Sequence, residues 1–352
     1  MKPILLLADA LESAASRDRE ALALAAGHRV TYGELEDAAN ALAFALLRRG
    51  VAPGDRVVTL LSGPETVVAF WAAAKSGVVC VPIEPADLES GALLGHDARA
   101  LVVDAELHGT FHHAVARASK VRAVIARGPF DAASATGVAS YVSWETALSE
   151  EGSHGPPERS GIDLDDQWLA RSTKGDARPF CALSQRALLS RGSSLARALS
   201  LGEKDSVGGA FPVPELAVAC ALSGASMRWA SPGTKRRSRT RSKSAGRQLW
   251  LDDAEGAPAG GVVVRVYATT ESGPIAVFAE GAEGGAVMPN VDVRVVDDKG
   301  QPLPPNVVGE IVVRSSGLFS NWVRGVEAPP AQQWRTGDSG MLDDAGRLYL
   351  MD

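Results

Sequence analysis

A short run of polar side chains that follows an apolar, β-branched stretch is the first candidate for chemistry. Residues 262–266 read VVVRV and predict a buried strand, and residues 267–271 then read YATTE before a Gly-Pro pair ends the strand. Tyr267 could stack on a flat ring, Thr270 could donate to an anionic oxygen, and Glu271 could hold a hard cation such as Mg²⁺. Ligands of open α/β sheets bind beyond the carboxyl ends of strands, which favours a site here. The alternative is a strand that ends in an ordinary polar turn.

A second polar stretch could contact phosphate groups. Residues 168–180 read WLARSTKGDARPF and precede a helix that we expect to begin at Ser184. Backbone amides of a loop that enters a helix can bind an anion, and here Ser172, Thr173 and Lys174 would line such a site. The stretch has one glycine where a phosphate-binding loop usually has several, so a plain surface loop is the alternative.

A third candidate is a carboxylate near the end of the chain. Residues 333–338 read QWRTGD, and residues 342–350 read LDDAGRLYL, which predicts a hairpin with a tight Ala-Gly turn. Asp338, which follows Thr-Gly, could accept hydrogen bonds from two ribose hydroxyls. It could equally cap its own turn, as aspartates in turns often do.

Composition argues against several other classes of function. The net charge of −6 over 352 residues argues against a surface that coats nucleic acid, and a chain of this length is expected to form two or more lobes. The basic run at 235–244 has no interleaved aromatic residues, so we interpret it as a solvated loop rather than a site for nucleic acid or anionic lipid. Cys80, Cys181 and Cys220 lack CxxC spacing, which predicts neither a zinc site nor a disulfide framework and favours a reducing compartment.

Neither membrane insertion nor a histidine metal site is expected. No apolar run reaches the length of a membrane-spanning helix. The apolar run at 4–8 is broken by Asp9 and is short for a signal peptide, so we expect a cytoplasmic protein, with secretion as the weaker alternative. His112 and His113 are adjacent in an expected helix and point in different directions, which favours a surface pair over two ligands of one metal.

Alternating strands and helices are expected to position these groups. Residues 31–50 predict a helix with a capping box at its start, and residues 56–61 and 78–83 predict buried strands on either side of a helix at 64–77. A strand, a helix and a strand with short joints form a βαβ unit, which implies a parallel sheet.

The remaining pattern is less regular and changes character near residue 260. Further strands are expected at 100–103, 121–125, 291–296 and 307–314, and further helices at 107–119 and 142–149. We therefore expect an α/β protein with βαβ-type layered sheets in residues 1–260. Residues 261–352 would carry the strand that leads to Tyr267 and a smaller, β-rich lobe that resembles a distorted barrel.

Five segments, taken in order, resemble successive motifs of the adenylate-forming enzymes. This superfamily contains AMP-binding acyl-CoA synthetases, adenylation domains of peptide synthetases, and luciferases. The five segments are VTYGEL at 30–35, AKSGVVCVPI at 74–83, YATTE at 267–271, GEIVVR at 309–314 and WRTGD at 334–338. The resemblance runs from near residue 20 to the end of the chain.

The resemblance implies a reaction and a set of ligands. Members of the superfamily join a carboxylic acid to the α-phosphate of ATP, release pyrophosphate, and in many cases pass the acyl group to a thiol. The implied ligands are ATP or AMP, Mg²⁺ and a small carboxylic acid, with a carrier protein or another protein as a partner. By motif, Tyr267 would stack on adenine beside Thr269, Thr270 would contact the α-phosphate, Glu271 would hold Mg²⁺, and Asp338 would bind the ribose.

Four features depart from the pattern of the superfamily. Its phosphate loop is rich in Ser, Thr and Gly and ends in Pro-Lys-Gly, whereas here Phe180 follows Pro179 after a stretch with one glycine. Residues 211–215 read FPVPE and lack the histidine that commonly lines the acyl pocket, and residues 228–260 are shortened around the basic run. The chain stops about where the hinge to the small C-terminal domain would begin, so we expect that domain and its catalytic lysine to be absent.

Because some motifs of the superfamily are present and others are altered, two functions from different classes are possible. The first is a divergent enzyme that forms an acyl-adenylate but is impaired alone, with Thr270 and Glu271 as its catalytic residues and a partner that supplies the missing lysine. The second is a non-catalytic homologue that binds or scaffolds a synthetase, since each lost electrostatic stabiliser costs roughly a hundred- to thousandfold in rate. A decayed gene product without a selected role is a third alternative.

Overall fold

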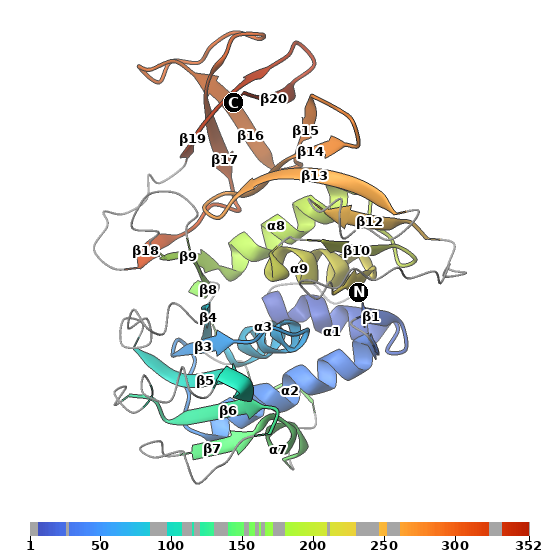
Figure 1. The fold of residues 1–352 in the computed structure, drawn as a ribbon, viewed down its shortest axis with the longest axis vertical. Helices are drawn as coiled ribbons and strands as arrows, with labels where there is room; N and C mark the ends of the chain where they lie inside the picture. Colours follow the sequence, from blue (N-terminus) through green and yellow to red (C-terminus); the bar gives the residue numbers. More distant parts are fainter. Residues whose placement is uncertain are drawn as a thin grey trace.

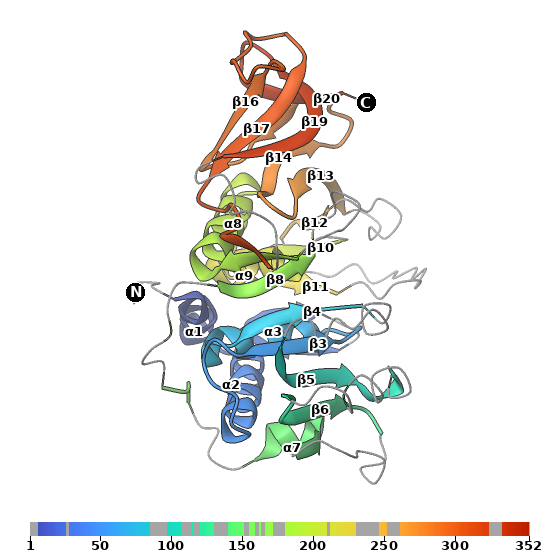
Figure 2. The ribbon, with the colours of Figure 1, turned by 90° about the vertical axis from the view of Figure 1, so that its left-hand side faces the viewer.

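The computed structural model describes residues 6–25, 28–84, 97–107, 115, 120–129, 140–150, 155–158, 162, 166–171, 180–209, 212–229, 246–251, 261–323 and 333–351. Its strands form two sheets with helices between them (Figure 1 and Figure 2). The helices are α1 (Leu7–Arg17), α2 (Tyr32–Arg48), α3 (Glu65–Ser76), α7 (Trp144–Ser149), α8 (Gln185–Ala198) and α9 (Val213–Ser223), with a 3₁₀ turn η1 at Ala105–Leu107. Within these described residues, none of the helices combines the length and the apolar character needed to cross a bilayer.

The smaller sheet contains the expected βαβ unit. Its strand order is β18-β9-β8-β4-β3-β5-β6-β7, and β3 pairs in parallel with both β4 and β5. The parallel sheet predicted from the strand–helix–strand pattern is therefore confirmed. The strands are β3 (Arg56–Leu60), β4 (Val79–Pro82), β5 (Ala98–Asp104), β6 (Ala123–Arg127), β7 (Ser140–Ser143), β8 (Asp166–Arg171), β9 (Phe180–Ser184) and β18 (Asn321–Val323).

The larger sheet changes from parallel to antiparallel at β13. Its order is β16-β17-β19-β20-β15-β14-β13-β12-β10-β11-β1-β2, with parallel pairs from β13 to β1 and antiparallel pairs from β13 to β16. The fold is thus a layered α/β architecture with a β-rich end, as expected. The strands are β1 (Leu22–Ala25), β2 (Arg29–Thr31), β10 (Ser206–Gly209), β11 (Ser226–Arg228), β12 (Gln248–Leu251), β13 (Val262–Thr269), β14 (Gly273–Ala279), β15 (Gly285–Val287), β16 (Val291–Val296), β17 (Gly309–Ser315), β19 (Trp334–Leu342) and β20 (Arg347–Met351).

Local sequence signals fix the ends of the predicted helices. The Thr31 hydroxyl accepts from the Glu34 amide at 3.2 Å, and the Glu34 carboxylate accepts from the Thr31 amide at 2.8 Å, so the capping box of α2 is confirmed. Helix α3 ends at Gly77, whose left-handed φ of 71° is tolerated because glycine has no Cβ.

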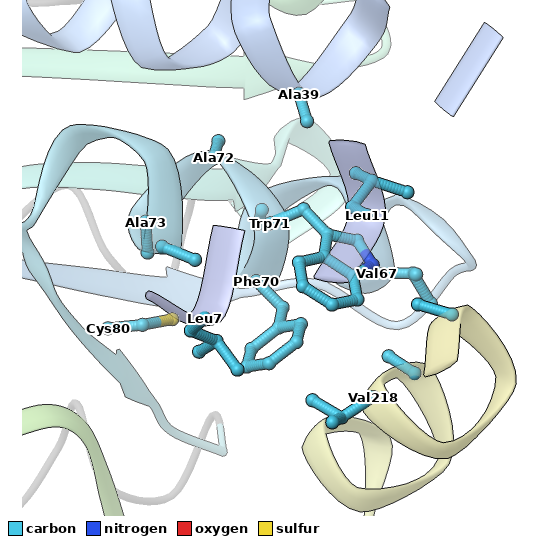
Figure 3. Close-up of a cluster of buried hydrophobic side chains, with 14 of the residues drawn as sticks. Leu7, Leu11, Ala39, Val67, Phe70, Trp71, Ala72, Ala73, Cys80 and Val218 are labelled. Carbon is cyan, nitrogen blue, oxygen red and sulfur yellow. The ribbon is translucent and has the colours of Figure 1, made fainter. Parts of the chain in front are cut away.

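The main core lies where helices from both halves of the chain meet. Helices α8 and α9 pack against the larger sheet on one side and against α1 and α3 on the other (Figure 1 and Figure 2). In Figure 3, Phe70 of α3 lies between Leu7 of α1 and Val218 of α9, and Trp71 of α3 lies beside Leu11 of α1. Burying large apolar side chains from all three helices against one another removes much apolar surface from water, which joins the two sheets into one folded unit.

Several elements differ from the sequence-based expectation. Residues 168–180, expected as one polar loop, include the end of strand β8 (to Arg171) and the first residue of strand β9 (Phe180), and these two strands pair antiparallel. Their short apolar runs gain strand structure from pairing with each other and with β4, which a local pattern does not reveal. Helix α1 and strand β7 were not expected from the sequence. Most of the helix expected at 107–119, together with His112 and His113, lies outside the described residues.

Candidate active site at the end of strand β13

Strand β13 carries the first candidate residues and is only partly buried. It pairs in parallel with β12 and antiparallel with β14 and extends to Thr269. The strand expected over 262–266 is confirmed as part of β13, but the expectation that all of it is buried is wrong, because Val264 and Val266 are buried whereas Val262 and Arg265 are exposed. One face of the strand packs into the main core and the other faces away from it, as alternation along a strand requires.

The turn after β13 is tied by hydroxyl groups. The Thr269 and Ser272 hydroxyls lie 2.8 Å apart, and the Ser272 amide donates to the Thr269 hydroxyl at 3.1 Å. Both side chains are buried, and Gly273, with φ of 72°, begins β14. Thr269 thus stabilises the turn that presents Thr270 and Glu271, and its predicted contact with a nucleotide stays a prediction.

Tyr267 and Asp338 meet although they are 71 residues apart in the sequence. The Tyr267 hydroxyl donates to Asp338 Oδ2 at 2.7 Å, from β13 to β19. Burial raises the pKa of Tyr267 above its ordinary value, and the hydrogen bond to the Asp338 carboxylate raises it further. The phenol therefore stays protonated and keeps donating to the carboxylate. The structure brings together the ring and the carboxylate that the sequence singled out separately.

A buried threonine orients the Asp338 segment of β19. The Thr336 hydroxyl donates to the Ile311 carbonyl at 3.1 Å and accepts from the Asp338 amide at 3.1 Å. Thr336 is 2% exposed, and Gly337 between them has a positive φ of 75°. The Asp338 backbone is thus held by Thr336 and its carboxylate accepts from Tyr267, while the predicted contact of that carboxylate with ribose hydroxyls stays a prediction.

Glu271 is buried beside a thiol. Its side chain is fully buried, and its negative charge is one of the influences that raise the pKa of Cys181. Burial is the main cause and raises the Cys181 pKa to about 12, with Arg191 acting in the opposite sense. The Cys181 thiol is therefore a neutral packing group against the turn, 4.0 Å from the Thr270 carbonyl.

The predicted Mg²⁺ site fits only a cation that arrives with a nucleotide. Among the described residues, no group of three or more His, Cys, Asp or Glu side chains converges in a way that could hold a metal. Mg²⁺ is commonly held by one or two carboxylates together with substrate phosphates, and Glu271 alone would match that arrangement. The donor set does not provide a cation site built from protein groups alone.

Arg191 of α8 donates hydrogen bonds to the backbone of the turn at Thr270 and Glu271 and was not singled out from the sequence. Its Nη2 donates to the carbonyls of Thr270 (3.1 Å) and Glu271 (3.0 Å), and its Nε donates to the Gly317 carbonyl at 2.6 Å. Its Nη1 pairs with Glu215 of α9 at 3.0 Å, and both side chains are almost fully buried. The available sequence signal was a charged residue on the apolar face of a helix, between Leu188 and Leu195 at helical spacing.

The predicted phosphate-contacting residues Ser172, Thr173 and Lys174 lie outside the described residues, as does the basic run at 235–244. The neighbouring Phe180, which stands near the position of the lysine in the motif, begins β9 and is 7% exposed in an apolar cluster with Ala182. Phe180 is therefore a core residue and offers no charge to a phosphate.

Known proteins resemble this chain in sequence and in fold. The sequence profile of the AMP-binding enzyme family matches residues 11–167 and 203–322, which is more than half of the chain. An indoleacetate–CoA ligase of Aromatoleum aromaticum is 31% identical over 99 residues, which cover 25% of this chain and 19% of the ligase. Malpibaldin synthetase of Mortierella alpina is 42% identical over 98 residues, which cover 26% of this chain and 2% of the synthetase. The aligned part is thus less than a fifth of either relative.

The fold matches solved structures over its whole length. The N-terminal domain of FACL13 from Mycobacterium tuberculosis superposes with a TM-score of 0.78, covers 100% of both chains and is 20% identical. An identity this low supports the shared fold and leaves the function to be argued from the site.

Proposed function

Because the chain belongs to the AMP-binding enzyme family, we propose that it binds ATP or AMP between β13 and β19 and takes part in forming an acyl-adenylate. The observation that carries this proposal is the hydrogen bond between Tyr267 and Asp338. It joins an aromatic ring and a carboxylate at one place, which are the groups needed for a base and a ribose. Thr270 and Glu271 sit in the turn that directly follows β13, and we propose that the phosphates of the nucleotide bind at this turn.

In the proposed reaction, a carboxylate oxygen of the acid attacks the α-phosphorus of ATP. The bond to the β-phosphate oxygen breaks, so the products are an acyl-adenylate and pyrophosphate. The residues of this chain would bind and orient: Tyr267 the base, Asp338 the ribose hydroxyls and Thr270 the α-phosphate. Mg²⁺ bound with the nucleotide would neutralise phosphate charge, with Glu271 as its protein ligand.

The substrate would be a small carboxylic acid, and the acceptor a thiol on coenzyme A or on a carrier protein. These proposals rest on the relatives, which by name include an indoleacetate–CoA ligase and a malpibaldin synthetase. No nucleic-acid partner is proposed, and a cytoplasmic location stays a prediction.

A second candidate is a non-catalytic homologue that binds a synthetase partner. It is favoured by one observation: Phe180 occupies the place near the motif lysine and is buried in the core. A chain without cationic groups around the phosphates would lose the electrostatic stabilisation on which phosphoryl chemistry depends. It could still retain the ring and carboxylate that hold AMP.

Calorimetry with AMP and with ATP–Mg²⁺, on the wild type and on Asp338→Ala, tests the nucleotide site directly. We expect binding by the wild type and a loss of about tenfold or more in affinity on substitution, since a hydrogen bond to a charged group contributes about 1.5–3 kcal/mol. Absence of binding by the wild type would overturn the proposal.

Pyrophosphate exchange with a panel of acids then separates the two candidates. Exchange that depends on the acid supports the enzyme. A protein that binds AMP but shows no exchange with any acid, alone or with added synthetases, supports the non-catalytic homologue.

A further inference from the structure

We propose that Arg191 is a positioning residue of the nucleotide site, which fixes the turn carrying Thr270 and Glu271, and that Glu215 keeps Arg191 in place. This inference rests on the proposed nucleotide site and adds an ion pair from α8 and α9 to it. Arg191 does not contact a nucleotide in this proposal; it acts through the backbone of the turn.

The guanidinium is matched to three backbone carbonyls at once. It donates to the carbonyls of Thr270, Glu271 and Gly317 at 2.6–3.1 Å. The Glu271 carbonyl also accepts from the Phe319 amide at 2.9 Å. A planar fork with several fixed donors can serve such divergent acceptors, which a single ammonium group cannot do. The carbonyls of the turn are thereby directed toward α8.

Glu215 makes this arrangement tolerable in the interior. Arg191 is 3% exposed and Glu215 is 3% exposed, so each charge would be costly without the other. Glu215 Oε1 pairs with Arg191 Nη1, and Glu215 Oε2 accepts no hydrogen bond from any residue that the structure describes. Arg191 is therefore the cation that neutralises Glu215 among these residues.

Two glycines leave room for the arginine side chain. A Cβ at Gly273 would lie 2.7 Å from the Arg191 side chain, and one at Gly317 would lie 2.9 Å from it. Gly273 also has a positive φ, whereas Gly317 does not, so Gly317→Ala would displace Arg191 without adding backbone strain there. The backbone on both sides of the arginine is shaped to admit it.

Arg191→Lys is the informative substitution because it keeps the charge facing Glu215 and removes the fork. We expect it to remain folded, and to bind AMP about tenfold more weakly in calorimetry because the turn is no longer held at three carbonyls. Amide hydrogen exchange in peptides spanning 268–273 and 316–320 should become faster. Gly317→Ala should produce the same two changes with both charges present.

Lys75→Met is the matched control. Lys75 of α3 is fully buried and pairs with Glu36 of α2 at 2.7 Å, so its replacement by Met breaks a buried ion pair away from the site, as Arg191→Met does beside the turn. We expect this variant to be less stable but to bind AMP within about twofold of the wild type. Equal weakening by Lys75→Met, or wild-type affinity in Arg191→Lys, would overturn the positioning role.

The experiments distinguish failure of the proposed nucleotide site from failure of the role of Arg191. If the wild type binds neither AMP nor ATP–Mg²⁺, the nucleotide site is refuted, and hydrogen exchange still decides whether Arg191 holds the turn. Exchange in 268–273 that does not change in Arg191→Lys or in Arg191→Met would overturn the inference.

Discussion

Removing one oxygen atom from Tyr267 should weaken nucleotide binding while leaving the stacking ring in place. In Tyr267→Phe, the Asp338 carboxylate loses the donor that lies 2.7 Å from its Oδ2, and a bound nucleotide must then order that carboxylate itself. A hydrogen bond to a charged acceptor contributes about 1.5–3 kcal/mol when fully buried. Tyr267 is only partly buried, so we expect about 1 kcal/mol, or roughly a fivefold weaker affinity for AMP.

Tyr267→Leu removes the ring as well and separates the two contributions. Stacking of a base on an aromatic side chain contributes about 1–3 kcal/mol, so the leucine variant should bind AMP about five- to a hundredfold more weakly than the phenylalanine variant. Both affinities are measured by calorimetry at a temperature where each variant is folded.

A second tyrosine–aspartate hydrogen bond, between Tyr349 and Asp343, provides a control for the Tyr267→Phe experiment. Tyr349 donates to Asp343 Oδ2 at 3.3 Å, within the same β-rich lobe but on the β19–β20 hairpin. Tyr349→Phe should leave AMP affinity within about twofold. The reasoning is refuted if Tyr267→Phe and Tyr267→Leu both bind like the wild type, or if Tyr349→Phe weakens binding as much as Tyr267→Phe does.

Other predictions concern the scaffold. Lys75→Met should lower the free energy of unfolding by about 3–5 kcal/mol in urea titrations, because it leaves Glu36 buried without its cation; a loss under about 1 kcal/mol would contradict this account. The pKa of Glu150 is lowered to about 2, chiefly by the hydrogen bond from Arg49, so the ionised Glu150 stabilises the fold above about pH 4.5 and this stabilisation is lost as pH falls toward 2. The difference in free energy of unfolding between the wild type and Glu150→Gln should therefore shrink over that range. A difference that does not change with pH would refute this account. Cys181, whose pKa burial raises to about 12, should resist a thiol reagent at neutral pH until the protein is unfolded in denaturant, and rapid labelling of the native protein would contradict its buried position.

Sequence patterns predicted the features that depend on neighbours along the chain. The Thr31–Glu34 capping box and the glycine that ends α3 involve residues within one helical turn, and the structure has both. Strands β8 and β9 were not predicted, because each is a short run that becomes a strand by pairing. The strand over 262–266 was predicted correctly but its full burial was not, for a related reason: apolar residues along a strand do not reveal that one face lies outside the core.

The same distinction applies to the candidate site. Residue type singled out Tyr267 and Asp338, but only the fold brings these two residues, 71 positions apart, close enough for the Tyr267 hydroxyl to donate to the Asp338 carboxylate. Arg191 contacts carbonyls that are 79, 80 and 126 residues away, and a carbonyl is present at every position, so no residue type could identify these acceptors. The only signal of Arg191 in the sequence was a charged residue on the apolar face of a predicted helix.

The position of β13 explains how nucleotide binding and catalysis could be separated in this chain. As the strand at which the larger sheet changes from parallel to antiparallel, β13 is fixed by β12 on one side and β14 on the other. Its terminal turn is held by Arg191, by Glu215 behind it, and by Phe319, all outside the divergent segment at 172–180. Changes in that segment can therefore remove phosphate chemistry without releasing the turn. For this reason binding of AMP and exchange of pyrophosphate have to be measured separately, since the proposed AMP site lies at a turn that the fold holds, whereas the proposed phosphate contacts lie in a segment that departs from the superfamily pattern.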